Sequence, residues 1–411
     1  MSRFKKSILG LGAVLLISLI SGVYAWQLLH KLEPVTALGV SSDGRYAVTT
    51  HQDGALVLWD IENRSRDVLS TEANLYSAYF ISDSDAFLWQ DLDNVVRIQR
   101  VDGKVIEAFE HFPTYGHVMD ASFSDYLASD VDWNIFHGHG EAIRPVMQDG
   151  ISPSFKGSGK ILKLTLSEQG QKFVSAGLGD RESPSVDEVP AVAPERRFSN
   201  YTGVTLWDLD TLDPIAMLPG NSYKVDATIS PDGQWVVSGD ENTLGFFWNT
   251  DAPQERHRMA SYNYGILRDG LPEGLPEDEY WDKSELIPVP KSTKPDKWGN
   301  LRSLATPTTI AIAFINGSEE FLRIGYSHYT RDKGMNRTHA ALFEAGNPWP
   351  QAYLDLGIDP YPSINNYSRN LSIDSAPEAN LLVTGHAFDG GITVYRYDPE
   401  VRTLSKEWVG K

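Results

Sequence analysis

The stretch SPDGQWVVSGDENTLGFFWN, residues 230–249, has a close copy in SSDGRYAVTTHQDGALVLWD, residues 41–60. In both copies a glycine stands 15 residues before a tryptophan, Gly44 before Trp59 and Gly233 before Trp248. Apolar and polar residues alternate between them, as is typical of half-buried β-strands. An Asp-Gly pair between such runs favours a tight hairpin, because glycine adopts positive φ at little cost. The stretch therefore predicts a run of antiparallel strands that the chain repeats.

Weaker copies follow the same spacing along the chain. Two keep the 15-residue interval and two lengthen it, by 22 and 11 residues respectively: Ser84 to Gln99, Asn380 to Tyr395, Gly170 to Trp207 and Gly317 to Phe343. A shorter copy covers residues 116–148. Together the copies predict seven units, which start near Val35, Leu75, His117, Lys160, Lys224, Thr308 and Asn370.

Repeated units of about 40 residues with four short strands are typical of a β-propeller. The residues resemble the WD-repeat family: Trp59-Asp60 and Trp207-Asp208 match its name-giving dipeptide, and Gly116-His117 is similar to its Gly-His opening. The resemblance covers residues 35–409 and implies an all-β, seven-bladed β-propeller of four-stranded antiparallel blades. It also implies a last blade completed by both chain ends. We expect the repeat tryptophans to be core residues rather than binding residues.

The N-terminus predicts a membrane segment. MSRFKK is basic, and residues 8–29 carry no charge, which is enough to span roughly 30 Å of hydrocarbon as one helix. Basic flanks tend to stay cytoplasmic, so the rest of the chain would face outward. The alternatives are a signal peptide cleaved near Ala25 and a buried core helix. The apolar run continues past Ala25 to Leu29, which favours an uncleaved signal anchor.

These patterns predict two regions, a transmembrane helix within residues 1–30 and a propeller over residues 31–411. The signal region is typical of a bacterial inner-membrane protein, so we expect a single-pass protein of envelope type with its C-terminal domain in the periplasm. A secreted or periplasmic protein is the alternative. The formal net charge of −19 disfavours a nucleic-acid partner, and the absence of cysteine excludes disulfides, thiolate zinc sites and cysteine nucleophiles.

Three insertions interrupt the repeats, at residues 178–200, 262–303 and 327–337. In a four-stranded meander, the turns from the second to the third strand and the crossings to the next blade lie on one face. The first and third insertions are turns of that kind, and the second is such a crossing. All three insertions are therefore expected on one face, which is frequently the working surface of a repeat protein.

The longest insertion carries the candidate partner-binding residues. It mixes prolines and acidic residues with five aromatic residues, and tyrosine and tryptophan are enriched in interface hot spots. The candidate binding residues are Tyr262, Tyr264, Tyr280, Trp281 and Trp298. The alternative is that these aromatic residues only pin the loop onto the propeller.

Catalytic and metal-binding patterns are weak. The HGHG run places His137 and His139 on one side of a strand, but the sequence shows no third ligand, so we expect no metal site there. His51 and His386 occupy similar turns in neighbouring blades and are interpreted as two surface turn residues, with a shared site as the alternative. Three Asp-x-Asp pairs lack the rest of a calcium loop and are interpreted as turns: Asp91/Asp93, Asp130/Asp132 and Asp208/Asp210.

The sequence thus predicts a membrane-tethered, extracytoplasmic propeller scaffold that binds proteins of the cell envelope through its loop-rich face. We expect no catalytic residue and no cofactor, because no hydrolase elbow, phosphate loop or zinc-protease helix occurs. Two alternatives remain open. One is a hydrolase or lyase with a metal or histidine centre near the axis, and the other is a carbohydrate- or ligand-binding sensor.

Overall fold

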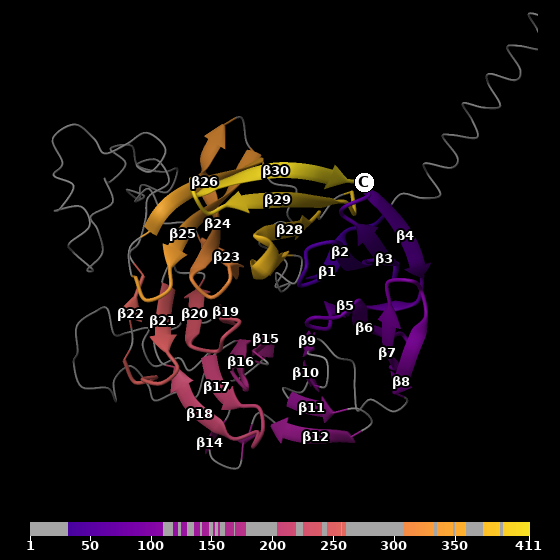
Figure 1. Cartoon of the computed structure of the whole chain (residues 1–411), viewed down its shortest axis with the longest axis horizontal. Helices are drawn as coiled ribbons and strands as arrows, with labels where there is room; N and C mark the ends of the chain where they lie inside the picture. The colour runs from indigo at the N-terminus through magenta and orange to yellow at the C-terminus, as the bar shows by residue number, and fades with distance from the viewer. Residues whose placement is uncertain are drawn as a thin grey trace, which may run out of the picture.

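The computed structural model describes residues 32–109, 118–121, 125–129, 135–139, 142–147, 151–152, 155–156, 161–167, 169–177, 204–218, 225–240, 245–255, 257–259, 308–332, 335–347, 350–358, 373–386 and 389–411. Within them, seven four-stranded antiparallel sheets stand around a central axis (Figure 1). The predicted seven-bladed, all-β propeller is confirmed.

Each blade is built from consecutive strands, numbered outward from the axis. The first three blades comprise β1 (Val35–Val40), β2 (Tyr46–His51), β3 (Leu56–Asp60), β4 (Ser65–Ser70); β5 (Ala73–Phe80), β6 (Ala86–Asp91), β7 (Val96–Arg100), β8 (Val105–Phe109); and β9 (Val118–Ala121), β10 (Asp125–Ser129), β11 (Ile135–His139), β12 (Ala142–Met147). A small hairpin follows, formed by β13 (Ile151–Ser152) and β14 (Phe155–Lys156).

The remaining four blades comprise β15 (Ile161–Ser167), β16 (Lys172–Gly177), β17 (Val204–Asp208), β18 (Pro214–Leu218); β19 (Val225–Ile229), β20 (Trp235–Asp240), β21 (Gly245–Asn249), β22 (His257–Arg258); β23 (Thr308–Asn316), β24 (Glu320–Asp332), β25 (Met335–Glu344), β26 (Pro350–Ile358); and β27 (Ile373–Ala376), β28 (Leu381–Gly385), β29 (Ile392–Asp398), β30 (Thr403–Gly410). A 3-10 turn, η2 (Pro377–Ala379), links β27 to β28. Every predicted unit start lies within three residues of the first residue of an innermost strand.

The two most similar repeats have the same turn geometry. Gly44 and Gly233 have φ of 70° and 72°, the left-handed region that glycine tolerates. The preceding Asp43 and Asp232 each accept a hydrogen bond from the backbone N–H two residues on, over 3.0 Å in both turns. The Asp-Gly pairs therefore close the turn between the first and second strands, as predicted.

The repeat tryptophans fill the spaces between blades. Trp59, Trp207 and Trp248 are fully buried, which confirms them as core residues. Trp59 donates from its indole nitrogen to Thr49 Oγ1 over 2.8 Å, and Trp207 donates to Ser175 Oγ over 2.9 Å. The aromatic ring supplies apolar area while a hydroxyl of the second strand satisfies its polar atom.

The expected closure of the last blade by both chain ends is wrong. All four strands of blade 7, β27 to β30, come from the C-terminal part of the chain. Blade 7 instead packs against blade 1 through a shared apolar core, which includes Leu38 and Val57 of blade 1 and Leu381 and Val394 of blade 7. The Val35 N–H donates to the carbonyl of His386 over 2.9 Å, and the rings of Trp59 and Trp408 meet edge to face at 6.2 Å. Blade 1 and blade 7 meet side by side, and no strand is shared between their sheets.

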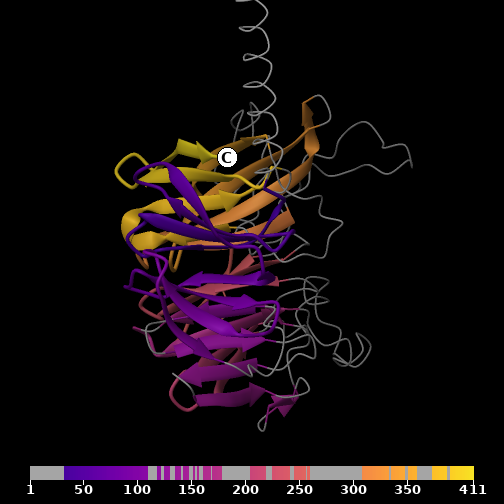
Figure 2. The ribbon, with the colours of Figure 1, turned by 90° about the vertical axis from the view of Figure 1, so that its right-hand side faces the viewer.

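The two faces of the ring carry different connections. We call the face with the second-to-third strand turns and the blade-to-blade crossings the insertion face, and the opposite one the short-turn face. Insertions 178–200 and 262–303 lie outside the described residues, whereas residues 327–337, except 333–334, extend strands β24 and β25. This orange hairpin stands out beyond the neighbouring strands (Figure 2). These described residues form strands where a loop was expected, and the pairing of β24 with β25 shifts its register between Ser327 and Asp332.

Residues 1–30 lie outside the described part of the chain, so the predicted N-terminal helix and the boundary at residue 31 stay predictions. Within the part that the structure describes, no helix has the length and apolar character needed to cross a bilayer.

Candidate functional site

A cavity of about 670 Å³ opens on the short-turn face where blades 5, 6 and 7 meet. Its lining residues include five carboxylates, one guanidinium and one tryptophan. The lining residues are Asp232, Gln234, Trp235, Asn316, Ser318, Glu319, Glu320, Glu344, Ala345, Pro399, Glu400 and Arg402. Turns of three blades supply these side chains, so the cavity exists only in the assembled ring.

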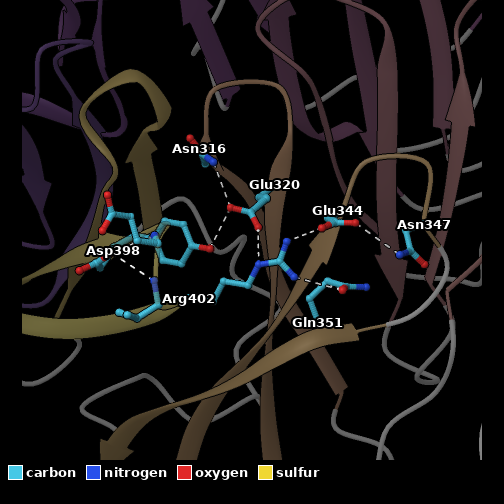
Figure 3. Close-up of polar contacts among 10 residues, drawn as sticks. Asn316, Glu320, Glu344, Asn347, Gln351, Asp398 and Arg402 are labelled. Atoms are coloured by element: carbon cyan, nitrogen blue, oxygen red, sulfur yellow. Dashed lines mark hydrogen bonds and ion pairs between the residues drawn. The ribbon is translucent and has the colours of Figure 1, made fainter.

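Glu320 is the buried centre of a polar network beside this cavity (Figure 3). Its Oε2 accepts hydrogen bonds from Tyr397 Oη over 2.8 Å and from Asn316 Nδ2 over 3.0 Å. Its Oε1 faces Arg402 Nε at 3.3 Å. Arg402 also forms an ion pair with Glu344 and donates to Gln351 Oε1 over 3.1 Å. The arginine of blade 7 is therefore held by three acceptors of blade 6.

This network has the properties of a structural clasp. Burial, and then the hydrogen bond to Glu320, raise the pKa of Tyr397, so its hydroxyl stays protonated and keeps donating. The hydrogen bond to Glu344 raises the pKa of Arg402, which stays cationic. Asp398 caps the same turn by accepting from the N–H of Glu400 over 3.0 Å. The clasp therefore fixes the last blade onto its neighbour, and the cavity beside it keeps an acidic wall.

A second cavity, of about 250 Å³, lies at the axis on the short-turn side of the innermost strands. Lys163 Nζ lies 3.0 Å from Asp226 Oδ1, and Asp226 Oδ2 accepts the N–H of Ile312 over 2.6 Å. Burial raises the pKa of Asp226, and Lys163 opposes that rise. Asp374 also lines the cavity, and burial raises its pKa to about 6. Both aspartates bond to the backbone of the next blade, so their first role is to join blades.

His51 and His386 do not form a shared site, and they are not the surface residues that were expected. Both rings are buried, but each bonds within its own surroundings. His51 Nε2 lies 2.7 Å from Thr49 Oγ1, and its Nδ1 lies 2.8 Å from the carbonyl of Glu33. His386 Nδ1 lies 2.6 Å from Asp389 Oδ1, and its Nε2 lies 2.8 Å from Thr393 Oγ1. Each imidazole therefore has both nitrogens engaged, and the two rings stabilise separate turns.

The remaining candidates also have structural roles. His137 is buried while His139 is exposed at the end of β11, and no group of three His, Cys, Asp or Glu able to hold a metal occurs among the described residues. Asp91 and Asp208 accept backbone N–H groups of their own turns, which confirms those two Asp-x-Asp pairs as turns. Asp130/Asp132 lies outside the described residues.

The predicted partner-binding residues all lie outside the described residues, so their role stays a prediction: Tyr262, Tyr264, Tyr280, Trp281 and Trp298. Sequence reasoning missed the Glu320–Arg402 clasp. One feature could have indicated this network: Glu320 lies directly opposite Glu344 in the pairing of β24 with β25. Two carboxylates directly opposite each other repel, and a cation between them removes that repulsion. The cation comes from another blade, which the local sequence does not identify.

Parts of the chain are similar in sequence to known proteins. Residues 26–60 and 212–249 match the family model described as "WD domain, G-beta repeat". The chain is 43% identical over 61 residues to the APC/C activator protein CDH1 of Saccharomyces cerevisiae. That match covers 14% of this chain and 11% of the relative, so it spans only about a tenth of that protein's length.

Solved structures match nearly the whole chain. The β-propeller domain of Cps50 (Swd1) from Myceliophteria thermophila superposes with a TM-score of 0.55 at 10% identity, over 88% of this chain and 96% of that one. A chain of a mitotic checkpoint complex gives a TM-score of 0.55 at 12% identity, over 89% and 91%. At such identities the similarity shows the fold alone.

Proposed function

We propose that this chain, a β-propeller with WD repeats, is a protein-interaction scaffold that is tethered to a membrane and binds its partner through the insertion face. Propellers with WD repeats bind proteins through turns that a rigid ring holds in place, and function depends on those turns rather than on the fold. The relative CDH1 is an APC/C activator protein, and one structural neighbour belongs to a mitotic checkpoint complex.

The observation that carries the proposal is the hairpin of β24 and β25. β24 has 13 residues, whereas the equivalent strands β2 and β20 have six each. Its outer part extends past the edge of the blade, so it adds little to the core of the ring (Figure 2). Extra structure that projects from one face of a repeat array is typical of a binding surface.

The flanking strands support a common face for all three insertions. β16 and β17, which flank residues 178–200, are the second and third strands of blade 4. β22 and β23, which flank residues 262–303, are the last strand of blade 5 and the first of blade 6. Both connections leave and re-enter on the insertion face. We propose that Tyr262, Tyr264, Tyr280, Trp281 and Trp298 contribute to the contact there.

The membrane tether is proposed from the sequence. The uncharged residues 8–29 follow a basic N-terminus, and the propeller would then face the periplasm of a bacterial envelope. The absence of catalytic activity, cofactor and nucleic-acid partner likewise stays a prediction. A stoichiometric metal ion in the purified protein would favour the enzyme alternative, and stabilisation by glycans in a thermal-shift screen would favour the sensor.

Affinity purification of the full chain from solubilised membranes tests the proposal. One variant replaces residues 327–337 by Asn-Gly, which joins the cross-strand partners Tyr326 and Thr338. A second variant deletes residues 262–303. The control is Asp102→Asn, which creates an Asn-Gly turn on the short-turn face at an exposed position.

We expect the wild type and the control to retain the same partner proteins, and the two insertion-face variants to lose at least one of them while unfolding at the wild-type temperature. Identical partners from all four chains would remove the insertion face from the proposed function. A chain found only in the soluble fraction would contradict the tether.

A further inference from the structure

The axial cavity contains a carboxylate that no cation of the described chain balances. Asp374, of blade 7, lines this cavity of about 250 Å³. Its Oδ2 accepts the backbone N–H of Val40 over 2.8 Å. Among the residues that the structure describes, no lysine, arginine or histidine forms an ion pair with it. An enclosed charge costs free energy unless a counter-charge lies beside it, so a cation bound here would gain that interaction.

Asp226, of blade 5, shows what is missing at Asp374. Each is the second residue of an innermost strand, and each accepts a backbone N–H of the next blade. Asp226 has in addition the ammonium of Lys163, from blade 4, at 3.0 Å. The innermost strands on either side of blade 7, β23 and β1, have no charged residue. The place that Lys163 fills beside Asp226 therefore has no occupant from these strands beside Asp374.

The seven innermost strands together carry more acidic than basic residues. They contain three aspartates and one lysine: Asp120, Asp226, Asp374 and Lys163. Burial raises the pKa of Asp374 to about 6, although the backbone N–H groups of Val40 and Ser375 and the charge of Lys163 oppose the rise. At neutral pH this carboxylate is therefore ionised, and it has no direct counter-charge.

The size and lining of the cavity limit what that cation can be. Liquid water occupies about 30 Å³ per molecule, so the cavity volume corresponds to about eight waters and admits a small molecule or one side chain. Val40, Ile312 and Ile373 are among its apolar lining residues and suit an alkyl chain. The exposed carboxylates Asp83 and Glu378 also line it and disfavour an anion.

An organic cation fits this lining better than a metal ion does. A metal ion needs several ligating side chains that converge on one point. No group of three His, Cys, Asp or Glu of that kind occurs in the described ranges of the chain. A primary ammonium group needs only one carboxylate as acceptor, and its alkyl chain can contact the apolar lining residues.

We propose that the axial cavity binds a primary alkylammonium group, which donates to the carboxylate of Asp374 while its alkyl chain lies along the apolar residues of the innermost strands. A free aliphatic amine and a lysine side chain of a protein partner share this chemistry. The cavity lies on the short-turn side of the ring, so this site depends neither on the insertion face nor on the membrane tether.

Isothermal titration calorimetry of the purified full chain at neutral pH tests the recognition of charge. The probes are putrescine, a lysine residue blocked as its acetyl methylamide, and butanediol, which resembles putrescine in length but carries no charge. We expect both amines to bind and the diol not to bind. Stronger binding of putrescine supports a free amine as the ligand, and stronger binding of the blocked lysine supports a protein lysine. Binding of neither amine, or equal binding of the diol, overturns the proposal.

A matched pair of variants locates the site. Asp374→Asn keeps the size of the side chain and an oxygen for the Val40 N–H but removes the charge, which should weaken amine binding at least about tenfold. Asp102→Asn makes the same change at an exposed turn residue that does not line the cavity, and it should bind the amine like the wild type.

Thermal unfolding of both variants without ligand shows whether they are folded. Unchanged affinity in a folded Asp374→Asn would place the amine elsewhere and overturn the site. The comparison of amine with diol uses only the wild type, so the proposal can fail even where Asp374→Asn does not fold.

Discussion

Asp374 of blade 7 accepts a hydrogen bond from the backbone N–H of Val40 in blade 1, over 2.8 Å. The same bond recurs between blades 5 and 6, where Asp226 accepts from the N–H of Ile312 over 2.6 Å. An aspartate on an innermost strand thus joins its blade to the next. No strand is exchanged between the first and last blades, so this bond is one of the contacts that hold the ring closed there.

Glycine at position 390 is predicted to be essential for that junction. Gly390 has φ of +65°, and an added Cβ would lie 2.4 Å from Leu32 Cβ. Gly103 has φ of +88° with nothing within 4 Å of an added Cβ. Both alanine variants carry the strain of positive φ, but only Gly390→Ala also overpacks, which typically costs about 1–3 kcal/mol. Urea denaturation should therefore show a lower midpoint for Gly390→Ala than for Gly103→Ala, and equal midpoints would contradict the close packing of Leu32 against Gly390.

Loss of the clasp arginine is predicted to destabilise the ring. Arg402→Met leaves the buried Glu320 carboxylate without its cation, and breaking a buried pair costs about 3–5 kcal/mol. Because the Arg402 side chain is 37% exposed, we expect about 1–3 kcal/mol. Arg396→Met is the matched control, since Arg396 pairs with Glu407 near the surface of the same blade and its loss should cost less than about 1 kcal/mol. Similar losses in the free energy of unfolding would show that the clasp has no special role.

Two groups near this junction are predicted to give opposite pH dependences of stability. Burial raises the pKa of Asp374 from 3.8 to about 6, so the folded state holds this proton longer than the unfolded chain does. Its contribution to stability is full below about pH 4 and is lost as the pH rises through about 6. Burial lowers the pKa of His51 from 6.5 to about 4, although the bond to Glu33 opposes the shift. That contribution is full above pH 6.5 and is lost as the pH falls toward 4.

In the wild type the pH-dependent contributions of Asp374 and His51 to stability cancel in part. A variant that lacks one of these groups shows the contribution of the other. Asp374→Asn should become less stable than the wild type as the pH falls from about 6 to 4, by at most about 3 kcal/mol, because only the histidine effect remains. His51→Asn should show the opposite slope over the same range. Free energies of unfolding measured at intervals between pH 4 and 7 test this, and parallel curves for all three chains would contradict it.

The blades were predictable because their turns have local causes. The 15-residue interval located Asn380, and the copy lengthened by 11 residues located Gly317; their φ angles are positive, 53° and 48° respectively. Each turn needs only a residue that tolerates this conformation between two alternating runs, which a single stretch of sequence can show. The degenerate copy in blade 2 was found by the same interval, from Ser84 to Gln99, although glutamine stands there in place of the repeat tryptophan.

The contacts between blades were not predictable in this way. The Glu320–Arg402 pair joins residues 82 positions apart on two blades, and no local pattern specifies which turn meets which. The closure of the ring depends on how Leu32 fits against Gly390, a matter of shape rather than periodicity. Family resemblance implied a last blade completed by both chain ends, whereas all four strands of blade 7 come from the C-terminal part of the chain.

Photo-crosslinking of the full chain in its native membrane tests the proposed function most directly. A photoreactive residue at Leu92, an exposed side chain in a turn of the insertion face, is compared with one at Asp210 on the short-turn face. The account predicts a crosslinked protein partner from position 92 that is absent from position 210. A partner captured only from position 210 would contradict it and place the binding surface on the opposite side of the ring.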